Sequence, residues 1–117
     1  MGHYFDELKR SMEYLGSYHD TIFIGQAVEY KGTAMTNTLK EINKSKLREM
    51  PVNEDMQLGV TNGLAVAGLV PISIFPRWNF LVLASNQLIN HLDKFPIFSH
   101  NEYVPKVIIR VGIGSER

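Results

Sequence analysis

Apolar residues recur along this chain at two spacings, one helical and one typical of strands, and the two alternate. A helical face covers residues 4–15 and is ended by Gly16; its apolar members are Phe5, Leu8, Met12 and Leu15. The next segment, TIFIGQAV at residues 21–28, is short, apolar and rich in β-branched side chains, which predicts a buried strand.

The same alternation continues to the end of the chain. A loop at 29–37 and a polar, weakly helical segment at 38–46 precede a second predicted strand at 47–52. A stronger helix is predicted from Glu54 to about Ala67, because Asn53 can cap its first turn and Gly68 can end it. A strand at 70–75, a helix at 79–94 and a strand at 106–112 follow. This order predicts an α/β fold, in which one parallel sheet is covered by helices on both faces.

Composition limits the classes of protein to consider. A chain of 117 residues with 44% hydrophobic content can enclose one core, so residues 1–117 are expected to form a single domain. Twelve basic residues balance twelve acidic ones, which argues against a broad nucleic-acid or anionic-membrane surface. The absence of cysteine excludes disulfides and thiolate chemistry, and no signal peptide or apolar run of about 18 residues is present. We therefore expect a soluble, cytoplasmic protein.

A parallel sheet also predicts where a ligand would bind. Ligands of such sheets lie beyond the carboxyl ends of the strands, where loops lead into helices. Three loops qualify here: the one after residue 28, the one at 52–54 and the one at 75–79. The stretch VNEDMQLGVTNGLAVAGLVPISIFPRWNF, residues 52–80, contains two of them.

The residues of this stretch have purely structural interpretations as well. Glu54 and Asp55 follow a helix cap, where carboxylates gain about 0.3–1 kcal/mol from exposed amides and the helix dipole. Trp78 and Phe80, taken alone, are typical of core residues. The glycines of the helix would let it approach a neighbouring backbone closely; they are Gly59, Gly63 and Gly68.

Four motifs follow one another in this part of the chain, and their order and spacing indicate a family resemblance. They are Asn53-Glu54, AGLVP at 67–71, WNF at 78–80 and NQLINHLDK at 86–94. Together with FIGQAVEYKG at 23–32, this set resembles the pyrimidine-binding module of thiamine-diphosphate enzymes. The resemblance is closest to the beta subunits of 2-oxo acid dehydrogenase complexes and to their transketolase-like relatives. It covers most of the chain, and it depends on the order and spacing of motifs that are individually unspecific.

The resemblance implies a cofactor site for thiamine diphosphate. Glu54 would hydrogen-bond a ring nitrogen of the aminopyrimidine, a role that requires a protonated and therefore buried carboxyl. Phe80, 26 residues later, would stack on the pyrimidine, and Val52 and Pro76 would form walls of the site. Gln26 stands where these subunits usually have a glutamate, and its neutral amide can still hydrogen-bond.

The chain also departs from the family. It has no GDG followed by an asparagine, the motif that holds Mg²⁺ and the diphosphate in a separate module, and its isolated histidines show no metal-ligand spacing. The active-site histidine and further strands of the family have no counterpart before residue 117, so the module is expected to be shortened at its C-terminus. An open sheet edge after Arg110 predicts a homo- or hetero-oligomer.

Two functional hypotheses follow. In the first, the chain is a pyrimidine-binding subunit or fragment of a thiamine-diphosphate-dependent dehydrogenase, decarboxylase or transketolase-like enzyme, inactive alone. A second subunit or module would then bind Mg²⁺ and the diphosphate. In the alternative, it is a non-catalytic relative that associates with itself or a partner. Retention of Glu54 and Phe80 favours the first hypothesis, and Gln26 with the missing C-terminal elements favours the second; the substrate stays open.

Overall fold

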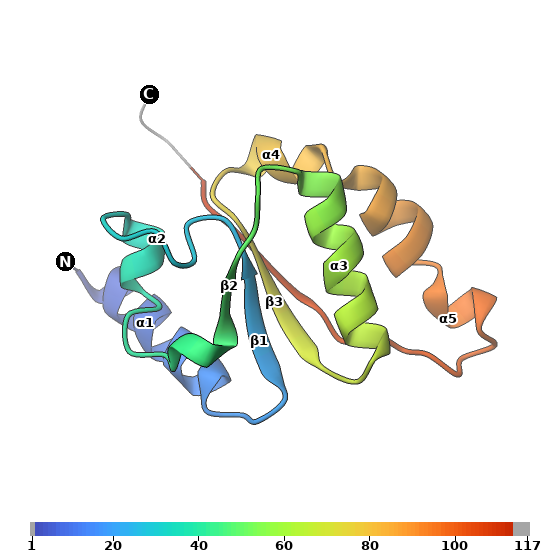
Figure 1. Cartoon of the computed structure of the whole chain (residues 1–117), viewed down its shortest axis with the longest axis horizontal. Helices are drawn as coiled ribbons and strands as arrows, with labels where there is room; N and C mark the ends of the chain where they lie inside the picture. Colours follow the sequence, from blue (N-terminus) through green and yellow to red (C-terminus); the bar gives the residue numbers. More distant parts are fainter. Residues whose placement is uncertain (1, 114–117) are drawn as a thin grey trace.

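The computed structural model describes residues 2–113 and is built on a four-stranded sheet (Figure 1). Its strands are β1 (Thr21–Gly25), β2 (Leu47–Glu49), β3 (Val70–Phe75) and β4 (Ile108–Val111). All neighbours pair in parallel, in the order β2-β1-β3-β4, with Phe23 of β1 opposite both Leu47 and Ile72. The predicted α/β class and parallel sheet are therefore confirmed.

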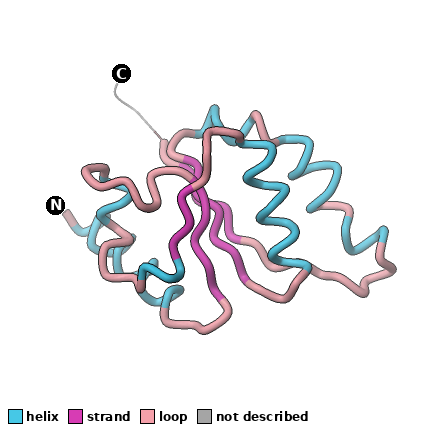
Figure 2. The backbone as a smooth tube through the Cα atoms, viewed as in Figure 1, coloured by secondary structure: helices cyan, strands magenta, loops and turns pink. Residues whose placement is uncertain are grey.

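Helices cover the sheet on both sides (Figure 2). On one side lie α1 (His3–Gly16) and the short α2 (Ala34–Asn37). On the other lie α3 (Glu54–Val66), α4 (Trp78–Val82), the π-helical η2 (Asn86–Leu92) and α5 (Phe95–Phe98). A single 3₁₀ turn, η1 (Lys44–Lys46), leads into β2.

Each face of the sheet has its own apolar cluster, because side chains alternate along a strand. Ile72 and Ile74 of β3 contribute to a cluster beneath α1, whose other buried members are Met12, Phe23, Val28, Leu39, Ile42 and Leu47. Phe75 contributes to a cluster beneath α3 and α4, together with Leu58, Leu81 and Ala84. The two clusters explain why the strands read as nearly continuous apolar runs.

Two strands are shorter than their sequences predict. β1 ends at Gly25 instead of residue 28, because Ala27 adopts a positive φ of 60° that an extended strand does not allow. β2 ends at Glu49 instead of residue 52. The backbone N–H groups of residues 27–29 are bound by the Glu49 side chain and not by a neighbouring strand.

Two helical predictions also need correction. The helix expected at 38–46 lies earlier, at α2, because the Thr33 hydroxyl accepts a hydrogen bond from the Thr36 amide and caps that turn. The single helix expected at 79–94 is divided between α4 and η2. Its second half has i→i+5 hydrogen bonds, such as that from the Asp93 amide to the Leu88 carbonyl at 3.0 Å.

The glycines behave differently from the prediction. A Cβ atom on Gly63 or Gly68 would meet nothing within 4 Å, and one on Gly59 would meet the Gln87 side chain, so none allows a close backbone approach. Gly68 does end α3, with a φ of +106°. The close approaches occur at Gly25, where a Cβ would lie 2.1 Å from the Ile74 carbonyl oxygen, and at Gly112, where it would lie 2.2 Å from that of Pro76.

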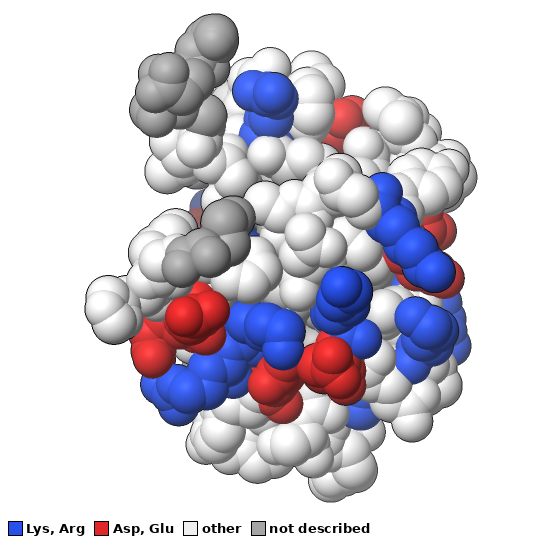
Figure 3. All heavy atoms as spheres, turned by 90° about the vertical axis from the view of Figure 1, so that its left-hand side faces the viewer, with Lys and Arg blue, Asp and Glu red and all other residues white. Residues whose placement is uncertain are grey.

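Charges of both signs mix on the surface that carries α1 (Figure 3). Lys9 pairs with Glu13 at 2.5 Å, and Arg10 pairs with Glu7, both along the exposed side of α1. Such pairs leave no broad surface of a single sign in this view. Among residues 2–113, no helix is long and apolar enough to cross a membrane.

Candidate functional site

The loops that follow β1, β2 and β3 meet at one edge of the sheet, because parallel strands all end on the same side (Figure 1). They carry Gln26, the segment that leads to Glu54, and Pro76, respectively. The start of α3 and the whole of α4 lie at this edge. The topology thus brings to one end of the molecule the segments that contain the sequence-predicted site residues.

Glu54 is the first residue of α3 and is buried, with 8% of its surface exposed. The Asn53 side chain caps the helix by accepting a hydrogen bond from the Met56 amide at 3.0 Å. Asp55, in the same first turn, is exposed. The Glu54 carboxyl forms no side-chain hydrogen bond or ion pair with any residue from 2 to 113. A carboxylate present only to interact with the helix dipole has no need of this burial.

Phe80 lies on α4 and is half-buried. It packs against the cluster that contains Leu58 and Phe75. Leu58 lies one helical turn after Glu54, on the same face of α3, because residues four apart are neighbours on a helix. The structure therefore packs Phe80 against the apolar cluster that contains Leu58, one helical turn after Glu54.

The other predicted site residues have mixed environments. Gln26 is half-buried, and its backbone amide donates to the Ile74 carbonyl at 3.2 Å. Pro76 is half-buried beside Gly112. Val52 is 79% exposed, so it can form a wall only if another molecule covers it. Trp78 is 60% exposed, and its interpretation as a core residue is wrong because its side chain lies on the outer side of α4.

Glu49 organises this edge, although no motif in the sequence marks it. Its carboxylate accepts hydrogen bonds from the amides of Ala27 (3.2 Å), Val28 (2.9 Å) and Glu29 (2.8 Å). In return, the Glu29 carboxylate accepts one from the Glu49 amide at 2.8 Å. These bonds fix the loop that begins at Gln26. An acidic residue at the end of a short strand was the only available signal.

Buried polar side chains fix α3 to the sheet. Gln57 donates through Nε2 to the Ser73 hydroxyl and to the Ile74 carbonyl, both at 3.0 Å. The Thr61 hydroxyl, one turn later, lies 3.0 Å from the same Ser73 hydroxyl. Because Gln57 and Glu54 belong to the same first turns of α3, this network also sets the position of the Glu54 carboxyl relative to β3.

This end of the sheet carries a largely buried carboxyl at the start of α3 and a half-buried aromatic ring on α4. A carboxyl can hydrogen-bond a flat heterocycle, and an aromatic ring can stack on one. Within residues 2–113, no three His, Cys, Asp or Glu side chains are grouped so that they could hold a metal ion. His91 is exposed and its Nδ1 lies 2.8 Å from Gln87 Oε1. No protein-family model and no curated protein matches this sequence.

Proposed function

We propose that this chain is the pyrimidine-binding part of a thiamine-diphosphate-dependent enzyme that acts on 2-oxo acids or ketoses. Glu54 hydrogen-bonds the aminopyrimidine ring and Phe80 stacks on it. A partner subunit or module binds Mg²⁺ and the diphosphate. The bound cofactor supplies the carbanion chemistry that neither chain has by itself.

The observation that carries this proposal is the contrast between Glu54 and Asp55. Both belong to the first turn of α3, where the helix dipole favours either carboxylate. Only Glu54 is buried, and its carboxyl has no partner among residues 2–113. The buried side-chain atoms without a partner among residues 2–113 are Gln57 Oε1 and Asn62 Oδ1, so the Glu54 carboxyl oxygens still reach solvent and are open to a ligand. A ligand that donates a hydrogen bond to this carboxyl is a physical reason for its placement.

The residues fit one end of the cofactor only. A carboxyl and an aromatic ring suit an aminopyrimidine, and Gln26, half-buried at the same edge, can add an amide hydrogen bond. No metal-binding group of side chains accompanies them within residues 2–113, so Mg²⁺ and the diphosphate require another polypeptide.

The exposed apolar side chains around the site support such a partner. Trp78, Val82 and Leu83 are 60%, 55% and 63% exposed, and Val52 is 79% exposed. Several large apolar side chains exposed on one short helix are typical of an interaction site, and aromatic residues are enriched among interface contacts. A partner that covers Val52 would complete the wall of the pyrimidine site.

Binding of thiamine to the chain alone tests this proposal without the partner. In saturation-transfer NMR, we expect the pyrimidine protons of thiamine to receive more saturation than the thiazolium protons. Glu54→Ala and Phe80→Ala should remove the signal, whereas Asp55→Ala, in the same turn, should retain it. Equal signals from Glu54→Ala and Asp55→Ala, or saturation that favours the thiazolium ring, would contradict the proposal.

The exposed apolar side of α4 also favours a second candidate function, in which the chain is a non-catalytic relative that associates with itself or a partner. This candidate predicts concentration-dependent sedimentation that Trp78→Ser abolishes and Tyr30→Ser, at an exposed tyrosine before α2, leaves unchanged. It also predicts no thiamine binding. The NMR experiment therefore separates the two functions, whatever the state of association.

A further inference from the structure

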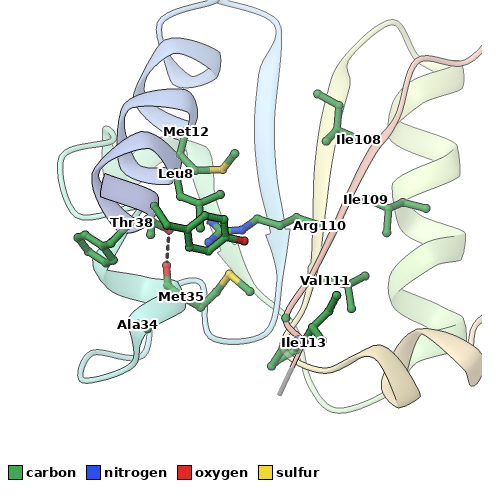
Figure 4. Close-up of a pocket in the computed structure, with 14 residues that line it drawn as sticks. Leu8, Met12, Ala34, Met35, Thr38, Ile108, Ile109, Arg110, Val111 and Ile113 are labelled. Atoms are coloured by element: carbon green, nitrogen blue, oxygen red, sulfur yellow. Dashed lines mark hydrogen bonds between the residues drawn. The ribbon is translucent and has the colours of Figure 1, made fainter. Parts of the chain in front are cut away.

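A groove lies between α1, α2 and β4, on the side of the sheet opposite to α3 (Figure 4). Side chains alternate along β4, so Ile109 and Val111 pack into the cluster beneath α3 and α4. Arg110 points the other way, toward α1 and α2, and lines the groove. Glu54 and Phe80 do not line it.

The groove combines apolar walls with one charge. Its volume is about 670 Å³, within the range of about 300–1,000 Å³ common for small-molecule sites. Leu8 and Met12 of α1 and Met35 of α2 supply apolar wall, and Ile108 continues it along β4. Among residues 2–113, Arg110 is the only charged side chain that lines it, and no lining residue is acidic.

The hydrogen-bonding capacity of Arg110 is largely unused. Its Nη1 donates to the Thr38 hydroxyl at 2.8 Å, whereas a guanidinium carries five N–H donors. It forms no ion pair with any acidic side chain of residues 2–113. Partial burial lowers the pKa of Arg110 through desolvation, an effect that the nearby Tyr4 opposes. A half-buried cation without an anion is costly, and a bound anion would offset that cost.

We propose that this groove binds a small organic carboxylate with an apolar body. The carboxylate oxygens accept hydrogen bonds from the Arg110 guanidinium, whose planar fork matches a carboxylate. The apolar body lies against Leu8, Met12 and Met35. A monoanion suits this groove better than a phosphate, because one cation is present and the remaining walls offer few donors. Pro76, a predicted wall of the Glu54 site, also lines this groove, but Glu54 and Phe80 do not, and the inference does not depend on the proposed function.

Octanoate, a monoanion with an apolar chain, is a suitable probe of the groove. The methionine signals report its binding site, because some methionines line the groove and others do not. Met12 and Met35 line the groove, whereas Met50 and Met56 lie outside it. In a chain labelled with ¹³C at the methionine methyl groups, octanoate should shift the signals of Met12 and Met35 and leave those of Met50 and Met56 in place. Equal shifts at all four methionines, or none at saturating octanoate, would overturn the proposal.

The variant Arg110→Gln tests whether the guanidinium charge binds the carboxylate. Arg48→Gln is the control, because it removes an exposed arginine from β2, the edge strand on the other side of the sheet. Hydrogen bonds to charged groups contribute about 1.5–3 kcal/mol, so Arg110→Gln should weaken octanoate binding at least about ten-fold. Arg48→Gln should leave it unchanged. Unaltered affinity in a folded Arg110→Gln protein would contradict the assigned role.

If Arg110→Gln does not fold, neutral and cationic analogues of octanoate can test the role of the Arg110 charge in the wild-type chain. With the wild-type chain, 1-octanol should shift the same two methionine signals but bind at least about ten-fold more weakly than octanoate. Octylammonium should not bind, because its charge repels the guanidinium. Comparable binding of all three compounds would show an unspecific apolar groove and refute the proposal.

Discussion

Gly25 ends β1 at the sheet edge that carries the candidate site, and replacing it with alanine should destabilise the fold strongly. Its φ of +144° lies in a region that side chains rarely adopt, which costs about 1–3 kcal/mol. An added Cβ would lie 2.1 Å from the Ile74 carbonyl oxygen, so β1 and β3 would have to separate by more than an ångström. That separation weakens at least the 3.2 Å bond from the Gln26 amide to the Ile74 carbonyl.

The size of this destabilisation follows from the backbone strain at residue 25 and from the hydrogen bonds lost when the strands separate. Strand hydrogen bonds contribute about 0.5–1.5 kcal/mol each, so the strain and the loss of two such bonds between β1 and β3 together cost about 2–6 kcal/mol. A domain of this size loses about 4 °C of melting temperature per kcal/mol, which predicts a decrease of about 8–24 °C. Thermal unfolding followed by circular dichroism measures it.

Two other glycines provide matched controls. Gly32 also has a positive φ, +96°, but a Cβ there would meet nothing within 4 Å, so Gly32→Ala should cost only the conformational term of about 1 kcal/mol. Gly63, inside α3 and equally open, should become about 0.5–1 kcal/mol more stable as alanine. If Gly25→Ala melted within about 4 °C of Gly32→Ala, the close contact between β1 and β3 would be wrong.

Three further predictions concern the rest of the molecule. Leu58→Ala should lower the free energy of unfolding by about 2–5 kcal/mol in denaturant, because the Leu58 side chain of α3 is fully buried against the sheet; a loss below about 1 kcal/mol would contradict this packing. Glu49→Gln should cost about 2 kcal/mol and speed hydrogen exchange of the amides at 27–29, and unchanged exchange would show that the carboxylate does not fix the loop. The hydrogen bond from Arg10 lowers the pKa of Glu7, so its stabilisation is present above the usual pKa and is lost as the pH falls through the lowered value. The melting temperatures of wild type and Arg10→Gln should therefore converge as the pH falls below the usual value of 4.5 and through the lowered pKa, and a constant difference would refute the pairing.

The alternation of apolar periods was sufficient to predict the parallel sheet and its cover of helices. Buried strands and the capped helix α3 have strong local signals, since Asn53 and Gly68 mark its two ends. The lengths of β1 and β2 could not be predicted, because they depend on Glu49, which binds amides 20 residues away in sequence. The residues around β1 therefore do not indicate that Glu49 will bind its following amides.

The site could be predicted only in part, for the same reason. The position of Glu54 at the start of a helix follows from its neighbours, but its burial depends on how α3 packs against β3 through Gln57 and Ser73. Trp78 differs from Glu54, because it is an aromatic residue typical of a core and yet is exposed on the outer side of α4. In the sequence, Arg110 marks only the open edge of the predicted sheet, and its groove requires α1, α2 and β4 together.

The most direct test of the central claim is turnover by the complex that contains this chain. The tagged wild-type chain would be isolated with its bound polypeptides, supplied with thiamine diphosphate, Mg²⁺ and a 2-oxo acid or ketose, and compared with Glu54→Gln and Asp55→Asn. We predict cofactor-dependent turnover that Asp55→Asn retains and Glu54→Gln lowers by a factor of about 10²–10⁴, the range for loss of a proton-transfer group. Turnover by Glu54→Gln equal to that of wild type, or no cofactor-dependent turnover at all, would contradict the claim.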